Sequence, residues 1–433
     1  MKRSEPLSIK PSHRKGDLSR GGLSPFRTLN RGIDMYFITD WTKRIDFDVL
    51  MKKRVESVRK KMKEYQLDAI LAFRNESIRY IMGMRPLWFP ITIHRNAVLM
   101  TQESAPISYI MVGEWAHRKA TMYWLKPEDV RPLVPFGNKV LLQKNLPNIQ
   151  RGFEELGISG GRIGVDLLTP DMFQGLQGIV PGAEWVELDE CICAARLVKN
   201  EEEIKLMRIA SVCVDVGFEA AIKSISVGRR ECEVLGEANR AMYGLGMEIP
   251  QCNSIVASGE NLYPLARFAS DRMIRNGDLV FIDIGGCFNG MFAEATRTVI
   301  CGRPNEEQKR IYRAILDSMK ALLNVLKPGK TSTDIYNALM EVFKSYGFEK
   351  YSPFTLMGHS IGVAGWEPPN LGDPDLTGVT FTLEPGMIFS IEPTLGIPDV
   401  PGGGAVRLEE EVLITETGNE VLTKTPYDER LLD

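Results

Sequence analysis

A chain of 433 residues is long enough for two domains with sizeable hydrophobic cores. Its 53 basic and 56 acidic residues nearly balance, which argues against a general affinity for nucleic acid or for anionic membranes. No apolar run approaches the ~20 residues that a membrane span requires. We therefore expect neither nucleic acid nor a membrane among its partners.

The N-terminal segment 1–45 is basic at its start and rich in Ser, Pro and Gly. It lacks the apolar stretch of a secretory signal, so we predict a basic N-terminal extension. The seven cysteines are odd in number and none are in CxxC spacing, which argues against a zinc ribbon and predicts a cytoplasmic protein. Only four histidines occur, which excludes a His-rich metal site; they are His13, His94, His117 and His359.

The segment 46–194 has the pattern of a small α/β domain. A helical pattern over 48–66 precedes a series of short strand-like runs that alternate with helical stretches. These runs lie at 68–73, 95–100, 106–112, 162–167 and 184–189.

The segment 195–433 predicts a larger α+β domain. It opens with what reads as one long amphipathic helix over 195–225, followed by a second near 231–245. The remaining predicted elements are a hairpin at 279–301, helices near 305–326 and 332–346, and strands at 383–393 and 405–415.

The hairpin FIDIGGCFNGMFAEATR (281–297) contains two acids that matter chemically. Asn289-Gly290 is a strong two-residue turn signal, which sets Gly285 opposite Glu294. Because side chains alternate along a strand, Asp283 and Glu294 then share one face as diagonal neighbours. Two such carboxylates repel unless a cation lies between them or one is protonated. The alternative is an ordinary solvated hairpin face.

Three later segments add metal-type ligands: His359 in MGHSIGV, Glu392 in FSIEP and Glu409 in VRLEEEV. Carboxylates with one imidazole suit Mn, Fe, Co or Zn rather than copper. Taken singly, each residue has a simpler interpretation: a histidine between glycines is often structural, and Glu409 could be one of three exposed acids.

Several segments in order resemble the creatinase / aminopeptidase P / methionine aminopeptidase superfamily, whose catalytic domain has the pita-bread fold. They are ARLVKNEEEIKLMRIA, NGDLVFIDIGG, AEATRTV, LKPGKTSTDI, GHSIG, LEPGMIFSIEP and VRLEEEVLITETG. The resemblance implies a pita-bread catalytic domain over 195–433 behind a creatinase-type N-terminal domain. It also implies a homodimer, in which one subunit's N-terminal domain packs over the other's catalytic site.

In the peptidases of this family, five ligands hold two metal ions, and the matching positions here are Asp283, Glu294, His359, Glu392 and Glu409. Glu294 replaces the family's Asp, which moves the carboxylate outward by about 1.5 Å, far more than the tolerance of metal–ligand distances. We therefore expect one divalent ion rather than two. His359, Glu392 and Glu409 are also the predicted catalytic residues, the two glutamates as proton shuttles.

Two departures from the peptidase pattern concern imidazoles. The peptidases carry a His where this chain has Ala266, and another in an HEPP motif that here reads WEPP, with Trp366. Those histidines orient and polarise the scissile carbonyl, which Ala and Trp cannot do. Their loss leads us to expect a non-peptidase enzyme.

Two non-peptidase branches offer precedents. Creatinase shares the GHSxGV wording but has lost both hairpin acids. The dimethylsulfoniopropionate lyase branch resembles this chain in LDAILAFRNESIRY and in its closing segment. However, its catalytic Asp falls at Gly365 and a second hairpin Asp falls at Gly285.

We therefore predict a metal-dependent hydrolase that cleaves a C–N bond in a small amide or guanidino acid. Trp366 would bind a cationic group through its π face, and Arg267 and Arg95 would pair with a carboxylate. The alternatives are lyase-type C–S cleavage, an Xaa-Pro peptidase and a catalytically silent binding scaffold. Core packing remains the competing explanation of Trp366, as a surface position does for Arg95.

Overall fold

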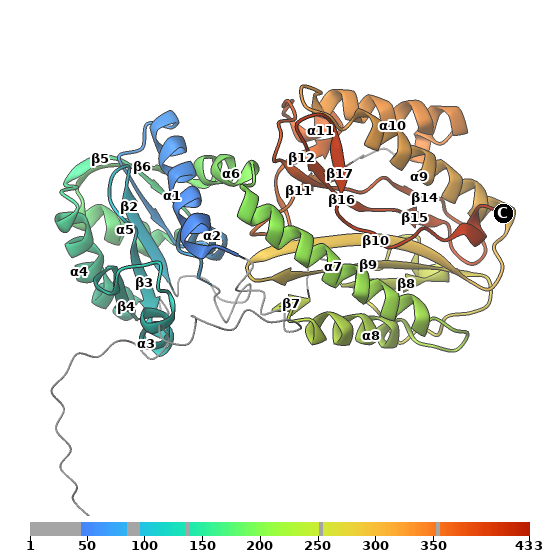
Figure 1. Ribbon diagram of the computed structural model, residues 1–433, viewed down its shortest axis with the longest axis horizontal. Helices are drawn as coiled ribbons and strands as arrows, with labels where there is room; N and C mark the ends of the chain where they lie inside the picture. Colours follow the sequence, from blue (N-terminus) through green and yellow to red (C-terminus); the bar gives the residue numbers. More distant parts are fainter. Residues whose placement is uncertain (1–44, 85–95, 135–138, 251–253, 352–355) are drawn as a thin grey trace, which may run out of the picture. The chain divides into compact units, whose positions relative to one another are not determined.

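The computed structural model describes residues 45–84, 96–134, 139–250, 254–351 and 356–433 (Figure 1). These residues belong to one compact unit, Ile45–Asp433. The predicted extension over 1–45 lies, except for Ile45, outside the described residues. Within these ranges, no helix combines the length and the apolar character needed to cross a membrane.

The first half of the unit is built on a six-stranded sheet with the strand order β4-β3-β2-β1-β5-β6 (Figure 1). The five predicted strand segments all form strands of this sheet. The strand β4 was not predicted; its Pro132 is tolerated because β4 lies at the sheet edge. The strands are β1 (Ala69–Ala72), β2 (Ala97–Thr101), β3 (Ile107–Met111), β4 (Val130–Leu133), β5 (Gly160–Val165) and β6 (Gly182–Glu187).

Helices accompany this sheet, and one core forms between them. Buried side chains from β1, β2, β3 and β5 meet those from α4 and α5, with Tyr109 and Phe153 among the largest. The helices are α1 (Phe47–Glu64), α2 (Asn75–Met82), α3 (Val112–Thr121), α4 (Lys139–Glu155), α5 (Pro170–Ile179) and α6 (Asp189–Leu197), with a 3-10 turn at Pro127–Asp129.

The long helix predicted over 195–225 is in fact two helices. The helix α6 ends at Leu197, and α7 (Glu201–Ser224) begins after a break. Asn200 caps α7: its side chain accepts hydrogen bonds from the backbone N–H groups of Glu202 and Glu203, while the Glu203 carboxylate accepts from the Asn200 N–H at 3.0 Å. This capping box is readable in the sequence, and it starts a new helix where periodicity alone continues one.

The second half contains three further sheets. One has the order β10-β9-β7 with β8 also paired to β9, one has the order β12-β11-β13-β16-β17, and β14 pairs with β15. The strands are β7 (Ile249–Pro250), β8 (Ile255–Ser258), β9 (Asp278–Phe288), β10 (Met291–Cys301), β11 (Leu356–Ser360), β12 (Glu367–Gly372), β13 (Ile388–Ile391), β14 (Thr394–Gly396), β15 (Ala405–Arg407), β16 (Glu410–Ile414) and β17 (Asn419–Val421).

Helices cover these sheets from outside. The helix α7 packs along β9 and β10, and α8 packs against both α7 and β8 (Figure 1). The helices α9 and α10 pack together and reach β15 and β12. The bounds are α8 (Glu231–Gly244), α9 (Glu306–Val325), α10 (Ser332–Tyr346) and α11 (Pro374–Thr377), with 3-10 turns at Gly259–Asn261, Glu349–Tyr351 and Glu429–Leu431.

The strand predicted over 405–415 is also divided, into β15 and β16. The two parts pair with different strands, β14 and β13. At the interruption, the Glu409 N–H donates to the Thr296 carbonyl of β10 at 3.0 Å. The break therefore ties the end of the chain to the hairpin.

The hairpin register is confirmed. Gly285 lies opposite Glu294, and Asn289 and Gly290 have φ values of 45° and 89°, as the two-residue turn requires. Every residue of both strands is buried, so the alternative of a solvated hairpin face is wrong. The hairpin is a central element that holds its two acids away from bulk water.

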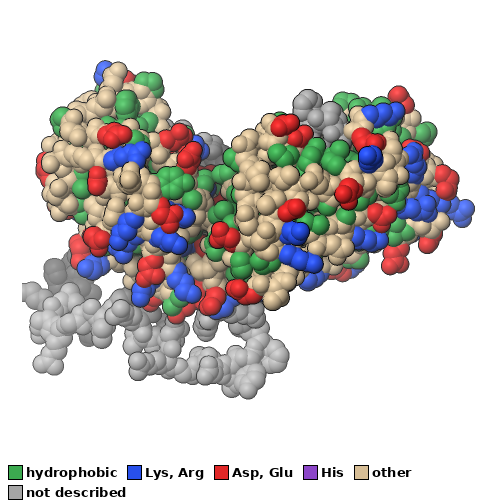
Figure 2. Space-filling view, turned by 90° about the horizontal axis from the view of Figure 1, so that it is seen from above, with side chains coloured by type: hydrophobic (Ala, Val, Ile, Leu, Met, Phe, Trp, Pro, Cys, Tyr) green, Lys and Arg blue, Asp and Glu red, His purple; other side chains and the backbone are tan. Residues whose placement is uncertain are grey.

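The surface carries mixed charge. Figure 2 shows basic and acidic side chains of the described residues interspersed over one face of the molecule. This matches the near balance of 53 basic and 56 acidic residues.

Gly285→Ala should destabilise the protein, because a Cβ there would lie 2.6 Å from the Ala293 carbonyl oxygen and 2.6 Å from the Glu294 Cβ. Overpacking of this kind costs about 1–3 kcal/mol. The matched control is Gly236→Ala in α8, where a Cβ would meet nothing within 4 Å. This substitution should stabilise the helix by about 0.5–1 kcal/mol. Thermal unfolding measures both; shifts of the same sign would contradict the prediction.

Candidate metal centre

Five segments of the second half bring their ligand-type side chains into one buried cluster. All five residues are at most 5% exposed. They are Asp283 on β9, Glu294 on β10, His359 on β11, Glu392 directly after β13, and Glu409 between β15 and β16. The structure therefore places together all five residues predicted as metal ligands.

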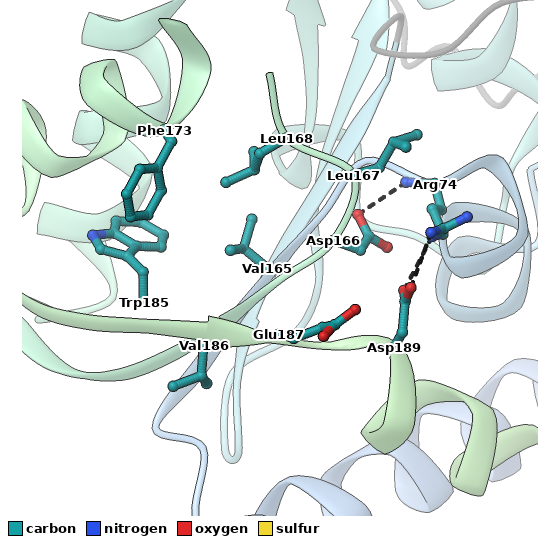
Figure 3. A pocket seen from close by; sticks show the side chains of 10 residues that line it. All are labelled: Arg74, Val165, Asp166, Leu167, Leu168, Phe173, Trp185, Val186, Glu187 and Asp189. Atoms are coloured by element: carbon teal, nitrogen blue, oxygen red, sulfur yellow. Dashed lines mark hydrogen bonds and ion pairs between the residues drawn. The ribbon is translucent and has the colours of Figure 1, made fainter. Parts of the chain in front are cut away.

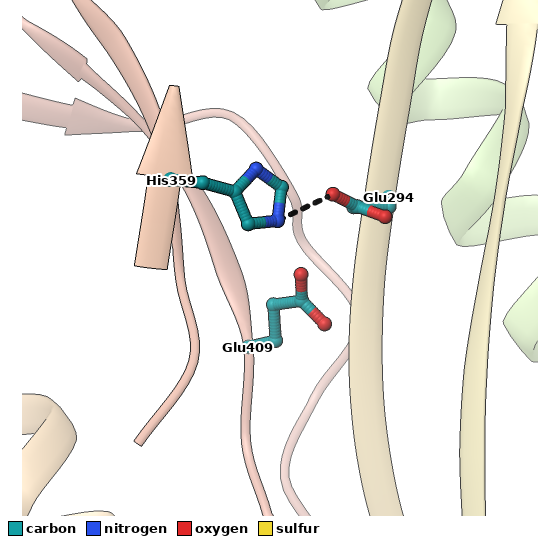
Figure 4. Close-up of side chains that lie close together, drawn as sticks. All are labelled: Glu294, His359 and Glu409. Carbon is teal, nitrogen blue, oxygen red and sulfur yellow. Dashed lines mark ion pairs between the residues drawn. The ribbon is translucent and has the colours of Figure 1, made fainter. Parts of the chain in front are cut away.

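The imidazole of His359 faces the carboxylates. Its Nε2 lies 3.2 Å from Glu294 Oε1 and 3.8 Å from Glu392 Oε1. Ligand atoms of Glu294, His359 and Glu409 all lie within 4.8 Å of one another. Figure 4 shows these three side chains pointing toward a common centre from three different strands or strand ends.

Arg407, at the end of β15, links the other two acids of the cluster. Its Nη1 lies 3.1 Å from Asp283 Oδ2 and 2.8 Å from Glu392 Oε2, and its Nε donates to the Thr394 hydroxyl at 2.7 Å. Sequence analysis missed this residue. The available signal was its place two residues before Glu409, which in an extended segment puts two side chains on one face.

Two hydroxyl groups hold Glu409. Thr296, opposite Asp283 in the hairpin, donates to Glu409 Oε2, and Ser390 on β13 donates to Glu409 Oε1. Both carboxylate oxygens are thereby oriented within the cluster. The alternative that Glu409 is one of three exposed acids is wrong, since Glu409, Glu410 and Glu411 are all buried.

Burial and mutual repulsion disfavour the charged forms of these acids. Burial, followed by the charge of Glu409, raises the pKa of Asp283 well above its usual value, although Arg407 opposes this. Burial and the charge of Glu392 likewise raise the pKa of Glu409. Asp283 Oδ1 is buried and has no hydrogen-bond partner among the described residues. A cation at this position would relieve the desolvation of that oxygen.

His359 has the orientation of a metal ligand. Its Nδ1 lies 3.0 Å from the Ser360 carbonyl oxygen, so an Nδ1–H tautomer would leave the Nε2 lone pair facing the acids. Burial alone would lower the pKa of His359, but the hydrogen bond and charge of Glu294 raise it to about 9. Without an ion, a proton on Nε2 would therefore compensate the acids; a divalent ion would compete with that proton.

The donor set fits a hard divalent cation. Four carboxylates and one imidazole supply oxygen and nitrogen ligands, which suit Mn, Fe, Co or Zn. The orphaned Asp283 oxygen and the oriented Nε2 of His359 support the same conclusion.

Trp366 forms a wall of the site. Its ring stacks on the His359 ring with centroids 4.2 Å apart and planes at 15°, and its indole N–H donates to Asn370 Oδ1 at 2.8 Å. The residue is 50% exposed, so core packing does not explain it. One ring face covers the predicted ligand while much of the indole remains accessible.

A second buried ionic group lies next to Trp366. Glu367, next to Trp366, lies 3.4 Å from Arg196 Nε and 3.7 Å from Lys199 Nζ. Lys199 also donates to the Ser360 hydroxyl at 3.1 Å, and its burial lowers its pKa. Lys199, just before α7, thus contacts the residue after His359 and the residue after Trp366. Sequence analysis missed this group.

The remaining predicted substrate residues do not join the cluster. Arg267 is exposed and forms no hydrogen bond or ion pair within the described ranges, while Ala266 packs against the core. Arg95 lies outside the described residues. Both arginines stay predictions.

Comparisons with known proteins agree on one family. The model of metallopeptidase family M24 matches residues 205–416, and the creatinase/prolidase N-terminal domain matches residues 54–198. The Xaa-Pro dipeptidase of Pyrococcus furiosus is 32% identical over 377 residues, which cover 87% of this chain and 99% of the relative.

Solved structures give the same result. The prolidase from Pyrococcus horikoshii OT3 superposes with a TM-score of 0.71 and 28% identity, covering 87% of this chain and 99% of that one. An Xaa-Pro dipeptidase from Bacillus anthracis has a TM-score of 0.72 at 25% identity, covering 87% of this chain and 99% of that one. These likenesses extend through both halves of the chain.

Arg407→Met should destabilise the metal-free protein by about 3–5 kcal/mol, because it leaves two buried acids without their cation. The loss should shrink when Mn²⁺ is added, since the ion supplies positive charge to the same carboxylates. Thermal unfolding in EDTA and in Mn²⁺ measures the difference. The control is Arg208→Met, which removes a solvent-exposed pair with Glu420 worth at most ~1 kcal/mol. An equal loss for Arg407→Met in both buffers would contradict the account.

Proposed function

Because the chain belongs to metallopeptidase family M24, we propose that it is a metal-dependent dipeptidase acting on Xaa-Pro dipeptides. The predicted family and the α+β pita-bread fold behind a creatinase-type N-terminal domain are confirmed. The observation that carries the proposal is the complete five-residue cluster in a chain similar over 87% of its length to an Xaa-Pro dipeptidase.

The prediction of a non-peptidase C–N hydrolase is wrong. Relatives that match nearly the whole chain are named Xaa-Pro dipeptidase or prolidase. That prediction treated two imidazoles as indispensable, whereas charge on a reacting carbonyl would be stabilised at the cluster itself. The names of these relatives also give no support to the lyase and silent-scaffold alternatives.

The family depends on divalent metal, and we infer that this chain holds one ion. Glu294, His359 and Glu409 form the group of closest ligand atoms, whereas Arg407 already places a positive charge between Asp283 and Glu392. A second ion would have to compete with that guanidinium. Mn, Fe, Co and Zn all suit the donors.

When bound, the ion supplies Lewis acidity toward a carbonyl oxygen and lowers the pKa of water. The protein would supply the proton transfers. Glu392 is the best placed residue for this role: Arg407 fixes its Oε2 at 2.8 Å, while its Oε1 lies 3.8 Å from His359 Nε2, beyond hydrogen-bond distance. Glu409, whose two oxygens both accept hydroxyl hydrogen bonds, is held for ligation instead.

Substrate recognition would use the exposed half of Trp366. A prolyl ring is apolar and rigid, and an indole face offers it a flat contact beside His359. We retain Arg267 as the candidate partner of the dipeptide carboxylate, because its guanidinium is exposed and unpaired among the described residues. The homodimer and the cytoplasmic location also remain proposals, and light scattering of the purified protein tests the first.

Incubation of the Mn²⁺-loaded protein with Ala-Pro should release proline, and His359→Ala should lower kcat/KM by at least about a hundredfold, because it removes a ligand. By mass spectrometry, the native protein should bind one metal ion per chain, and His359→Ala should bind less. The control is Glu341→Gln, an exposed change in α10 remote from the cluster in sequence. No proline release with any of Mn, Fe, Co or Zn would overturn the proposal, and two ions per chain would overturn the single-ion inference.

Trp366→Ala should raise KM for Ala-Pro by about three- to tenfold, the equivalent of one lost aromatic contact. Trp366→Phe, which preserves a stacked ring, should recover most of this loss. Steady-state kinetics measures both variants. A fall in kcat with unchanged KM would instead show that the indole acts by positioning His359.

A further inference from the structure

A cavity of about 240 Å³ opens in the first half of the chain, independently of the metal centre. It lies at the carboxyl ends of β5 and β6, and Figure 3 shows the side chains around it. Its volume is far more than the roughly 10–15 Å³ of such space that one water molecule needs. The space suits a small molecule rather than a polypeptide segment.

The cavity lies at the point where the sheet topology reverses. β1 and β5 are parallel neighbours. After β1 the chain continues to β2 on one side of the sheet, and after β5 it continues to β6 on the other. The segments leaving the two strands diverge, and in open α/β sheets such a switch point forms the crevice in which ligands bind.

The polar groups at the floor of the crevice already form hydrogen bonds within the protein. Asp166, directly after β5, is 2% exposed. Its Oδ1 accepts from the N–H groups of Phe73 and Arg74 at 2.5 and 3.0 Å, and its Oδ2 accepts from the Ser77 hydroxyl at 2.8 Å. The backbone donors that would bind a phosphate at such a site are therefore occupied.

Arg74, the only cationic side chain among the described residues that line the cavity, is also neutralised. Arg74 forms a two-point pair with Asp189, with Nε–Oδ1 and Nη2–Oδ2 distances of 3.0 and 2.9 Å. Glu187, in contrast, is exposed at the end of β6 and has no hydrogen bond or ion pair among the described residues. The unpaired charge of the cavity is thus negative.

The opposite wall is aromatic. Figure 3 shows Phe173 and Trp185 on one side of the cavity, with the Glu187 carboxylate between them and the Arg74–Asp189 pair. Val165 and Leu168 fill the space next to the two rings. An apolar body would bury these surfaces, while a positive charge would be attracted both to Glu187 and to the ring faces.

The backbone at the rim is strained. Leu167 has a φ of 45°. This left-handed conformation is sterically unfavourable for a residue with a branched side chain. Such conformations gather at ligand sites, where the surrounding structure enforces them. Leu167 directly follows Asp166, whose carboxylate accepts from the backbone N–H groups of Phe73 and Arg74 after β1.

We propose that this crevice binds a small organic cation with an apolar body, such as a primary amine bearing a ring. The amine pairs with Glu187, and the apolar body lies against Phe173 and Trp185. The site is separate from the metal centre, so it does not depend on the proposed peptidase reaction.

The test uses 2-phenylethylamine with the full chain, followed by saturation-transfer NMR and calorimetry. We expect saturable binding with a Kd on the order of millimolar. The neutral 2-phenylethanol and the anionic phenylacetate, which share its ring, should bind more weakly. Glu187→Gln should weaken amine binding about fivefold, and Trp185→Ala about tenfold.

Glu128→Gln is the matched control, since it neutralises an exposed acid of the same half of the chain beside β4. It should leave binding unchanged. If binding persists in both Glu187→Gln and Trp185→Ala, the amine binds at another site, such as the metal centre. That result would overturn the proposal. So would equal binding of amine and alcohol, or no saturation. Circular dichroism confirms that each variant is folded.

Discussion

The burial of four carboxylates in one cluster constrains the rest of this structure. Each charge removed from water costs several kcal/mol unless it is paired, and the fold meets this cost with Arg407, with the imidazole of His359, and with hydroxyl donors to Glu409. The pairing remains incomplete, as the raised pKa of Asp283 and its orphaned oxygen show. A divalent ion would complete it, in agreement with the metal dependence of the family.

Several details of the chain path serve this cluster. The two-residue turn at Asn289-Gly290 fixes the register that sets Glu294 beside Gly285. The interruption between β15 and β16 lets Glu409 bond to the hairpin through Thr296. The break before α7 places Lys199 where it holds both Ser360 and Glu367. These three departures from regular secondary structure each position a side chain of the site or of its surroundings.

The sequence predicted local features well and their junctions poorly. The hairpin register followed from turn chemistry, and the five predicted ligand positions followed from a family resemblance carried by several motifs in order. Arg196 and Lys199 could not be found in this way, because their roles depend on contacts between segments more than a hundred residues apart. The function was mispredicted for a different reason. The missing imidazoles at 266 and 366 were given more weight than the five ligand positions that the same motifs supplied.

The central claim is that Glu294, His359 and Glu409, with Asp283 and Glu392 adjoining, enclose a divalent ion. Anomalous X-ray diffraction from crystals soaked in Mn²⁺ tests it most directly. The account predicts one strong anomalous peak within ligand distance of His359 Nε2 and of the Glu294 and Glu409 carboxylates. A peak only on the protein surface, or none at this cluster at saturating Mn²⁺, would contradict it.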